Sequence, residues 1–270
     1  MSVPRKIMLI TGASGGIGAD LARLAAARGH DLALVARNRA ALDALADEIA
    51  TSPGQQNPRP LVFDLDLSLP GAVKTLVEAV EAAGAAPEIL VNNAGYGLLG
   101  PAVESDLAAQ LGMIDLNIRA LTELSLAFAP KLIELRGRLL NTASIVAFMP
   151  GPGMAVYYAS KAYVLSFSEA LSAELAPRGV SVTTLCPGHV PTGFQSRARF
   201  TDDMGWAKLG SMPSPAVARA AYEGMMAGKR VVVPGLLMKL MALTAPLTPK
   251  SLTLGALNRL QMRRGRKEVA

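Results

Sequence analysis

Tyr157 and Lys161 stand four residues apart in the segment Tyr-Tyr-Ala-Ser-Lys-Ala-Tyr, whose composition suits a helix. Side chains at this spacing lie on one face of a helix, so the phenol and the ammonium group would be neighbours. Free tyrosine titrates near pH ~10, and bringing its pKa to ~7 takes about 4 kcal/mol. A cation about 4 Å away supplies roughly that energy at an effective dielectric of ~20. The pair therefore predicts a tyrosine that exchanges protons near neutral pH because Lys161 lowers its pKa.

Ser144 follows a predicted strand at Arg138–Thr142, so its hydroxyl could bind the same substrate oxygen as Tyr157. A Y-x-x-x-K pair by itself is weak evidence, because helices carry such pairs by chance. The elements that position these residues must therefore decide whether the pair is catalytic.

The chain begins with a pattern that is typical of a phosphate-binding turn. Lys6–Ile10 is a short apolar run that predicts a buried parallel strand, Thr11–Gly18 is glycine-rich, and Ala19–Arg28 predicts a helix. The glycines let the backbone approach a pyrophosphate, and the helix N-terminus supplies amide donors and a positive dipole end. The alternative is a tight turn with incidental glycines.

Arg37 follows a second predicted strand, Asp31–Val35, in the run Ala-Arg-Asn-Arg. Dinucleotide folds often carry an acidic residue near this point, which binds the adenosine ribose hydroxyls. A guanidinium instead suits a 2′-phosphate. A charged hydrogen bond of roughly 1.5–3 kcal/mol would give a ~10- to ~100-fold preference for the phosphorylated cofactor. The alternative is a solvated arginine at a helix start.

Strands and helices alternate along the rest of the chain. We expect five further strands, at Leu61–Leu65, Glu88–Val91, Arg138–Thr142, Val180–Leu185 and Val231–Val233. We expect further helices at Ala40–Ala50, Pro70–Ala82, Glu104–Leu135 (two helices joined near Gly112) and Tyr157–Ala176. This order predicts an α/β fold: one doubly wound domain over residues 1–235, with a seven-stranded parallel sheet and helices on both faces. Its ligand would lie at the carboxyl ends of the strands.

Composition narrows the function classes. Hydrophobic residues make up 51% of the 270 residues and charged residues 18%, which is typical of a folded domain with a large core. A single cysteine, Cys186, excludes a disulfide framework and a cysteine-based metal site, and we expect no metal. The first residues lead directly into a strand, so we expect no signal peptide and a cytoplasmic protein.

The net charge of +6 is uneven, because residues 231–270 carry seven basic side chains against Glu268 alone. A neutral body with a basic tail argues against a broad nucleic-acid surface.

Several motifs, which occur in the expected order along the chain, resemble those of the short-chain dehydrogenase/reductase family in its compact form. The motifs that carry the resemblance are TGxxxGxG through Gly12, Gly16 and Gly18, NNAG at Asn92–Gly95, the tetrad Asn117, Ser144, Tyr157 and Lys161, and Pro187-Gly188 with Thr192. The resemblance covers roughly Lys6–Gly235. No single motif is decisive, but all of them in order leave little room for chance.

The resemblance implies a hydride-transfer mechanism. Tyr157 would donate a proton to the carbonyl oxygen of the substrate, and Ser144 would hold that oxygen. Lys161 would lower the pKa of Tyr157 and bind the ribose hydroxyls, and Asn117 would hold a water that continues the proton path. Asp66 looks like the residue that meets the adenine amino group, with Asp64 as the fallback.

The resemblance also implies the cofactor-binding residues and favours NADP(H) over NAD(H). The residues are Gly12, Ser14, Gly15, Gly16, Ile17, Gly18, Arg37, Asp66, Asn93, Ala94, Gly95, Tyr157, Lys161, Pro187, Gly188, Val190 and Thr192. Gly15 departs from the pattern, because NADP-using members often carry a basic residue there. The turn also fits TGxxGxxG through Gly12, Gly15 and Gly18, which resembles longer sugar-nucleotide-modifying relatives; the NNAG segment and the absence of a large C-terminal substrate domain count against them.

Residues 191–215 should form a lid over the substrate. The lid carries Phe194, Phe200, Met204, Trp206, Leu209 and Met212, and Phe148, Met149 and Met154 could line the opposite wall. Such a pocket would suit a fairly large apolar ketone or aldehyde. Equally, these residues could only pack the lid on the body.

Residues 236–270 predict an apolar and basic helical extension that is too short and interrupted to span a bilayer. It suits either attachment to anionic lipid or packing on a second subunit of a homodimer or homotetramer, and we slightly prefer a subunit contact or covering segment because solubility is the default.

The leading hypothesis is an NADP(H)-dependent carbonyl reductase or alcohol dehydrogenase acting on a small molecule. The alternatives are a non-catalytic NADP(H)-sensing protein, and an epimerase or dehydratase that uses a transient oxidation. The intact tetrad favours the enzyme.

Overall fold

The computed structural model describes residues 4–52, 58–191, 210–251, 253–255 and 257–258. Within them, one all-parallel sheet has the strand order β3-β2-β1-β4-β5-β6-β7. The strands are β1 (Arg5–Thr11), β2 (Leu32–Ala36), β3 (Leu61–Asp64), β4 (Ala85–Asn92), β5 (Arg138–Thr142), β6 (Ser181–Leu185) and β7 (Val231–Val232). The order reverses between β1 and β4, which is where doubly wound sheets bind their ligands. The predicted fold class is confirmed.

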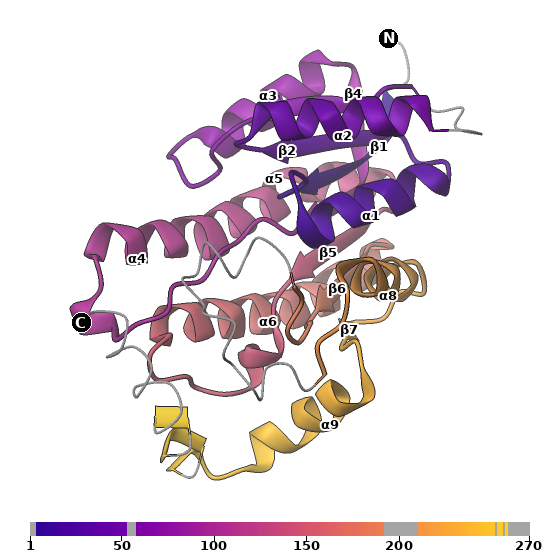
Figure 1. Ribbon diagram of the computed structural model, residues 1–270. Helices are drawn as coiled ribbons and strands as arrows, with labels where there is room; N and C mark the ends of the chain where they lie inside the picture. Colours follow the sequence, from indigo (N-terminus) through magenta and orange to yellow (C-terminus); the bar gives the residue numbers. More distant parts are fainter. Residues whose placement is uncertain (1–3, 53–57, 192–209, 252, 256, 259–270) are drawn as a thin grey trace.

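Helices cover both faces of the sheet (Figure 1). One layer contains α1 (Gly16–Ala27), α2 (Arg39–Thr51) and α8 (Ser214–Met226). The other contains α3 (Ala72–Ala82), α5 (Leu121–Glu134) and α6 (Ala155–Leu175). Two further helices are α4 (Leu107–Ile114) and α9 (Leu236–Thr244).

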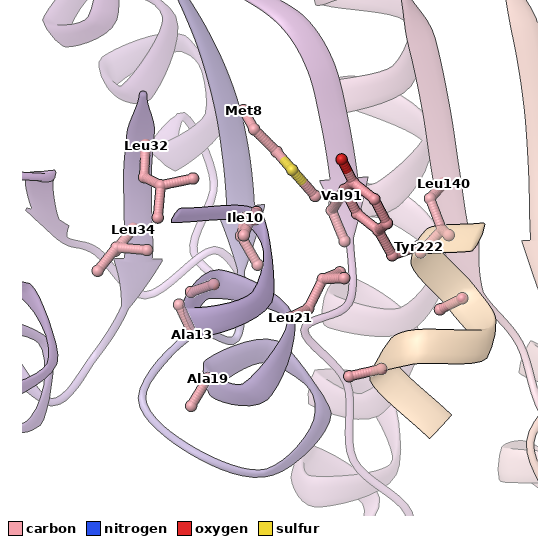
Figure 2. Packing of buried hydrophobic residues seen from close by; sticks show 14 of the residues in the cluster. Met8, Ile10, Ala13, Ala19, Leu21, Leu32, Leu34, Val91, Leu140 and Tyr222 are labelled. Carbon is pink, nitrogen blue, oxygen red and sulfur yellow. The ribbon is translucent and has the colours of Figure 1, made fainter. Parts of the chain in front are cut away.

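Alternation along β1 divides the core into two halves, because successive side chains of a strand point to opposite faces. Met8 and Ile10 pack with Leu21 of α1 and Tyr222 of α8, as Figure 2 shows. Ile7 and Leu9 pack into the cluster on the other face. The sheet is therefore buried on both sides, and its carboxyl edge is left to form a site.

The region from Glu104 to Leu135 differs from the prediction. Gly112 lies inside α4 and is not a joint; α4 continues through a π-helical turn, Asp115–Ala120, into α5. A Cβ at Gly112 would come within 3.0 Å of the Tyr96 hydroxyl oxygen, so the glycine allows close packing there. The irregular turn instead contains Asn117, and π-turns are frequent at functional sites.

Helix α9 lies at the edge of the molecule. Figure 1 shows α9 beyond β7, at the opposite end from α2 and α3. Among the described residues, none of the helices is both long and apolar enough to cross a bilayer. Residues 192–209 of the predicted lid, which include Thr192, and the basic residues from Arg259 to Lys267 lie outside the described residues.

Candidate active site

The glycine turn after β1 has the features of an anion-binding site. Gly12 and Gly16 have φ values of +68° and +53°, a conformation that glycine adopts most readily. In this described part of the chain, no side chain caps the N-terminus of α1, and its first turn contains no acidic residue. The first-turn amide groups and the helix dipole are therefore left for an anion, so the residues present fit the diphosphate of a dinucleotide.

The glycine turn is fixed to the end of β4. Thr11 Oγ1 accepts hydrogen bonds from the backbone N–H of Asn93 at 2.9 Å and of Ala94 at 3.0 Å. The Asn93 side chain donates to the Thr11 carbonyl oxygen at 3.0 Å. A Cβ on Gly18 would overlap the Gly12 carbonyl oxygen and lie 2.7 Å from Asn93 Nδ2, whereas Gly15 faces open space. The turn and the predicted Asn93–Gly95 segment therefore form one unit.

Ser144, Tyr157 and Lys161 come together at the carboxyl end of β5, and all three are buried. The Ser144 hydroxyl hydrogen-bonds to the Tyr157 side chain. Lys161 Nζ donates to the Thr142 carbonyl oxygen at 2.8 Å and lies 5.9 Å from the centre of the Tyr157 ring. A Cβ at Gly95 would come within 3.3 Å of Lys161 Nζ, so the lysine also borders the segment after β4. The predicted triad is thus one cluster beside the glycine turn.

The expectation that Lys161 alone lowers the pKa of Tyr157 is wrong. Burial raises the pKa of Tyr157 above its ordinary value, and the hydrogen bond with Ser144 opposes this only in part. Burial also lowers the pKa of Lys161 to about 8. An effective dielectric of ~20 describes a partly solvated pair, whereas both groups are buried here, and desolvation disfavours each charged form. The phenol is therefore protonated at neutral pH and is a proton donor.

The low pKa of Lys161 predicts a measurable stability effect. Between about 8 and its ordinary value of 10.5, the unfolded chain holds a proton on this lysine that the folded chain lacks. Burying the lysine charge destabilises the folded chain most below pH ~8, where Lys161 is charged in both states. This destabilisation disappears as the pH rises towards 10.5, the pKa of the lysine in the unfolded chain. Across this window, wild type should therefore gain about 1.4 kcal/mol of unfolding free energy per pH unit relative to Lys161→Met.

Urea unfolding of both cofactor-free proteins at several pH values checks this expectation. The comparison with Lys161→Met cancels the titration of groups that Lys161 does not influence. Cys186, whose pKa burial raises to about 12, interacts with the charge of Lys161, so the comparison is repeated in a Cys186→Ala background. Lys74→Met, at an exposed site on α3, controls for the loss of a lysine. Parallel stability curves for wild type and Lys161→Met would show that burial does not perturb Lys161.

Asn117 is buried, and its side chain joins three segments. Its Nδ2 donates to the Tyr96 carbonyl oxygen at 2.9 Å and to Ser160 Oγ at 3.0 Å, while its Oδ1 accepts from the Tyr96 N–H at 3.1 Å. These bonds link the π-turn, the segment after β4 and α6. The side-chain amide therefore positions the elements around Lys161.

Thr11 and Ser160 are positioning residues that the sequence pattern does not identify. The pattern marks Thr11 only as the first residue of the glycine turn, although it bonds the segment after β4. Ser160 lies directly before Lys161 and holds Asn117 across the site. The position of Ser160 inside the Y-x-x-x-K segment was the available signal, but its partner is 43 residues away and only the fold brings them together.

Arg37 and Asp66 lie side by side at the ends of neighbouring strands. Arg37 Nη1 donates to Asp66 Oδ2 at a long 3.3 Å, and 65% of the Arg37 side chain is exposed. Burial opposes ionisation of Asp66, but hydrogen bonds from Ser68 and the charge of Arg37 outweigh it and hold the pKa of Asp66 below its usual value.

Asp64 pairs instead with Arg39 at 3.1 Å. Arg39 also binds Asp43, which makes Arg37 the more weakly held guanidinium.

The segment after β6 borders the same cluster. The Ile145 N–H donates to the Pro187 carbonyl oxygen at 2.9 Å, which places the Pro187-Gly188 turn next to Ser144. A Cβ on Gly188 would lie 2.7 Å from the sulfur of Met238 in α9. Val190 is buried in the core on the α1 and α8 side.

The predicted pocket wall is divided between two clusters. Met149 and Met154 pack in the cluster that contains Tyr157. Phe148 packs instead against residues that include Val164 and Cys186. Met212 packs against the core on the α1 and α8 side. Two of the three predicted wall residues therefore lie with the candidate proton donor.

Comparison with known proteins points to one family. Residues 6–203 match the family model described as short chain dehydrogenase. A short chain dehydrogenase of Pseudocercospora fijiensis is 37% identical over 188 residues, which are 68% of this chain and 60% of that protein. The chain therefore spans less than two thirds of the length of that relative.

Two solved structures are also similar. A short-chain dehydrogenase from Sphingobium yanoikuyae in complex with NADPH is 34% identical, with a TM-score of 0.78 over 88% of this chain and 92% of the other. The bulky-bulky ketone specific alcohol dehydrogenase from Comamonas testosteroni is 31% identical, with a TM-score of 0.72 over 87% of this chain and 88% of the other.

Proposed function

This chain belongs to the short-chain dehydrogenase family and is an oxidoreductase with a nicotinamide cofactor, and from this premise we propose that it is an NADP(H)-dependent carbonyl reductase. The observation that carries the proposal is the buried cluster of Ser144, Tyr157 and Lys161 beside an uncapped, glycine-lined helix N-terminus. A proton donor and a dinucleotide cradle at one sheet edge are what hydride transfer to a carbonyl group requires.

The residues around the glycine turn would hold the cofactor. The amide groups at the start of α1 would bind the diphosphate, and Arg37 would bind the 2′-phosphate. Asp66 would accept a hydrogen bond from the adenine amino group, because Ser68 and Arg37 keep its carboxylate ionised and oriented. Lys161 would bind the ribose hydroxyls.

The bound cofactor would supply a hydride at the nicotinamide. Tyr157 would donate its proton to the carbonyl oxygen, and the raised pKa of Tyr157 keeps the phenol protonated for this step at neutral pH. Ser144, which hydrogen-bonds to Tyr157, would hold the same oxygen. Asn117 keeps the π-turn and α6 in place around the lysine, and it would also hold the water that resupplies the proton.

A fairly large apolar ketone or aldehyde is the substrate class we propose. Met149 and Met154 pack with Tyr157, and flexible thioether side chains adapt to irregular apolar ligands. The similar protein from Comamonas testosteroni is specific for bulky-bulky ketones. Rates that fall as the carbonyl compound becomes longer and more apolar would contradict this choice.

The test of the function is NADPH and NADH oxidation by purified protein with carbonyl compounds graded in length and polarity. Wild type should prefer NADPH, and Arg37→Ala should reduce that preference ~10- to ~100-fold, the value of one charge-assisted hydrogen bond. The measurement is the ratio of kcat/KM for the two cofactors.

Arg39→Ala is the matched control, because it removes one positive charge two residues away, at the start of α2, where Arg39 binds Asp43 and Asp64. Its NADPH preference should stay near the wild-type value. An equal fall in both variants would show that the general positive charge after β2, and not contact with Arg37, sets the preference.

A further inference from the structure

Helix α9 presents a row of exposed leucines to solvent. Leu236, Leu240 and Leu243 are 84%, 57% and 71% exposed and share one side of the helix, because they are spaced by four and three residues. Leu247, in the following turn, is 83% exposed. We call these four residues the leucine face. On the opposite side, Met238 is only 7% exposed and packs against Gly188, so α9 is anchored to the body.

We propose that the leucine face docks this protein on the surface of an anionic lipid bilayer. A short helix with one apolar side and basic flanks lies in the plane of the interface and does not span it. The leucine side chains would enter the boundary between headgroups and acyl chains.

The positive charge of the sequence around the leucine face favours an anionic partner. Between Glu223 and Glu268 the chain contains nine lysine and arginine residues and no acidic residue. Lys239 lies within α9 and Lys250 follows it; both are exposed. Each basic residue near an anionic membrane surface adds about 1 kcal/mol of attraction, within a Debye length. Apolar and basic residues thus occur together on the same segment.

A second copy of the chain fits this face less well. A symmetric contact brings the same surface of both subunits together, so two basic segments would meet when the leucine faces pack on each other. The segment offers no carboxylate to pair with them. Lipid phosphates satisfy the charges and the acyl region accepts the leucines.

The anchor of α9 places the proposed surface beside the candidate active site. Met238, on the inner side of the helix, contacts the Gly188 turn, and that turn is bonded next to Ser144. Docking through the leucine face would therefore hold this end of the site near the bilayer.

The experiment is co-sedimentation of the full chain with vesicles of phosphatidylcholine, alone or with phosphatidylglycerol. Wild type should bind the anionic vesicles, and added salt should weaken the binding. The triple variant Leu236→Ser, Leu240→Ser, Leu243→Ser should bind at least tenfold more weakly, since each buried CH₂ group that is lost weakens membrane binding by about fourfold and each leucine loses more than one carbon group. The double variant Lys239→Glu, Lys250→Glu should also lose about tenfold or more.

Matched controls use residues with similar exposure on other elements. Leu107, Leu111 and Leu126, on α4 and α5, are 70%, 49% and 53% exposed, and their triple serine variant should bind vesicles like wild type. Lys74→Glu with Lys131→Glu controls for the charge reversal. Thermal unfolding of each variant shows whether it is folded; if the leucine variant is not, the lysine variant, which changes only exposed side chains, carries the test.

The proposal is wrong if wild type does not bind vesicles, or if it binds neutral and anionic vesicles equally. It is also wrong if the folded leucine and lysine variants bind anionic vesicles as strongly as wild type. A leucine variant whose mass in solution falls while vesicle binding is unchanged would assign the face to a second copy of the chain.

Discussion

Tyr157→Phe should lower the turnover of carbonyl substrate by about 10²- to 10⁴-fold, the usual contribution of a positioned general acid. The variant removes the proton that this phenol would donate and keeps the ring that packs with Met154. NADPH binding should change little, because the glycine turn and Arg37 are untouched. The measurements are kcat at saturating NADPH and the NADPH dissociation constant from the fluorescence of the bound cofactor.

Tyr163→Phe is the control for this variant. Tyr163 lies on the same helix and loses a comparable hydrogen bond, to Thr122 at 2.8 Å, but it packs outside the candidate site. Its turnover should remain near the wild-type rate. Full activity of Tyr157→Phe would remove Tyr157 from its proposed role, and joint loss of activity and NADPH binding would indicate a structural role instead.

Gly18→Ala should nearly abolish NADPH binding and lower the free energy of unfolding by about 2–3 kcal/mol, a typical cost of overpacking. The new methyl group would overlap the Gly12 carbonyl oxygen and approach Asn93 Nδ2. The obstruction is backbone, so the turn must open, and its amide groups move out of position. Losing two charge-assisted hydrogen bonds would weaken binding by about 100-fold or more.

Gly15→Ala is the matched comparison for this glycine. Gly15 lies three residues earlier, its backbone is extended, and no atom lies within 4 Å of an added Cβ. The change should lower the free energy of unfolding by about 1 kcal/mol, the typical loss when alanine replaces a better N-cap residue, because no overlap adds to it. Isothermal titration with NADPH and urea unfolding measure both variants. Equal effects at the two positions would show that close packing of the turn does not determine binding.

The positions of the parallel strands along the chain and the position of the site at the carboxyl edge follow from local pattern. Apolar runs such as Lys6–Ile10 lie inside observed strands, and the glycine, asparagine and aspartate residues after them lie where a parallel sheet binds ligands. Helix ends moved by a few residues; α1, for example, begins at Gly16, three residues earlier than predicted. Such ends depend on capping contacts that a hydrophobic pattern does not contain.

Local pattern is enough to predict which residues gather at the site, because parallel strands deliver their carboxyl ends to one edge and a spacing of four places Tyr157 and Lys161 on one helix face. The packed fold is needed to know how those residues ionise, what holds Asn117, and which side of α9 faces outward. Desolvation depends on every element packed around Tyr157 and Lys161. The partners of Asn117 are 21 and 43 residues away. The outward face of α9 is set by the contact of Met238 with Gly188, which joins helix and turn only after the chain has folded.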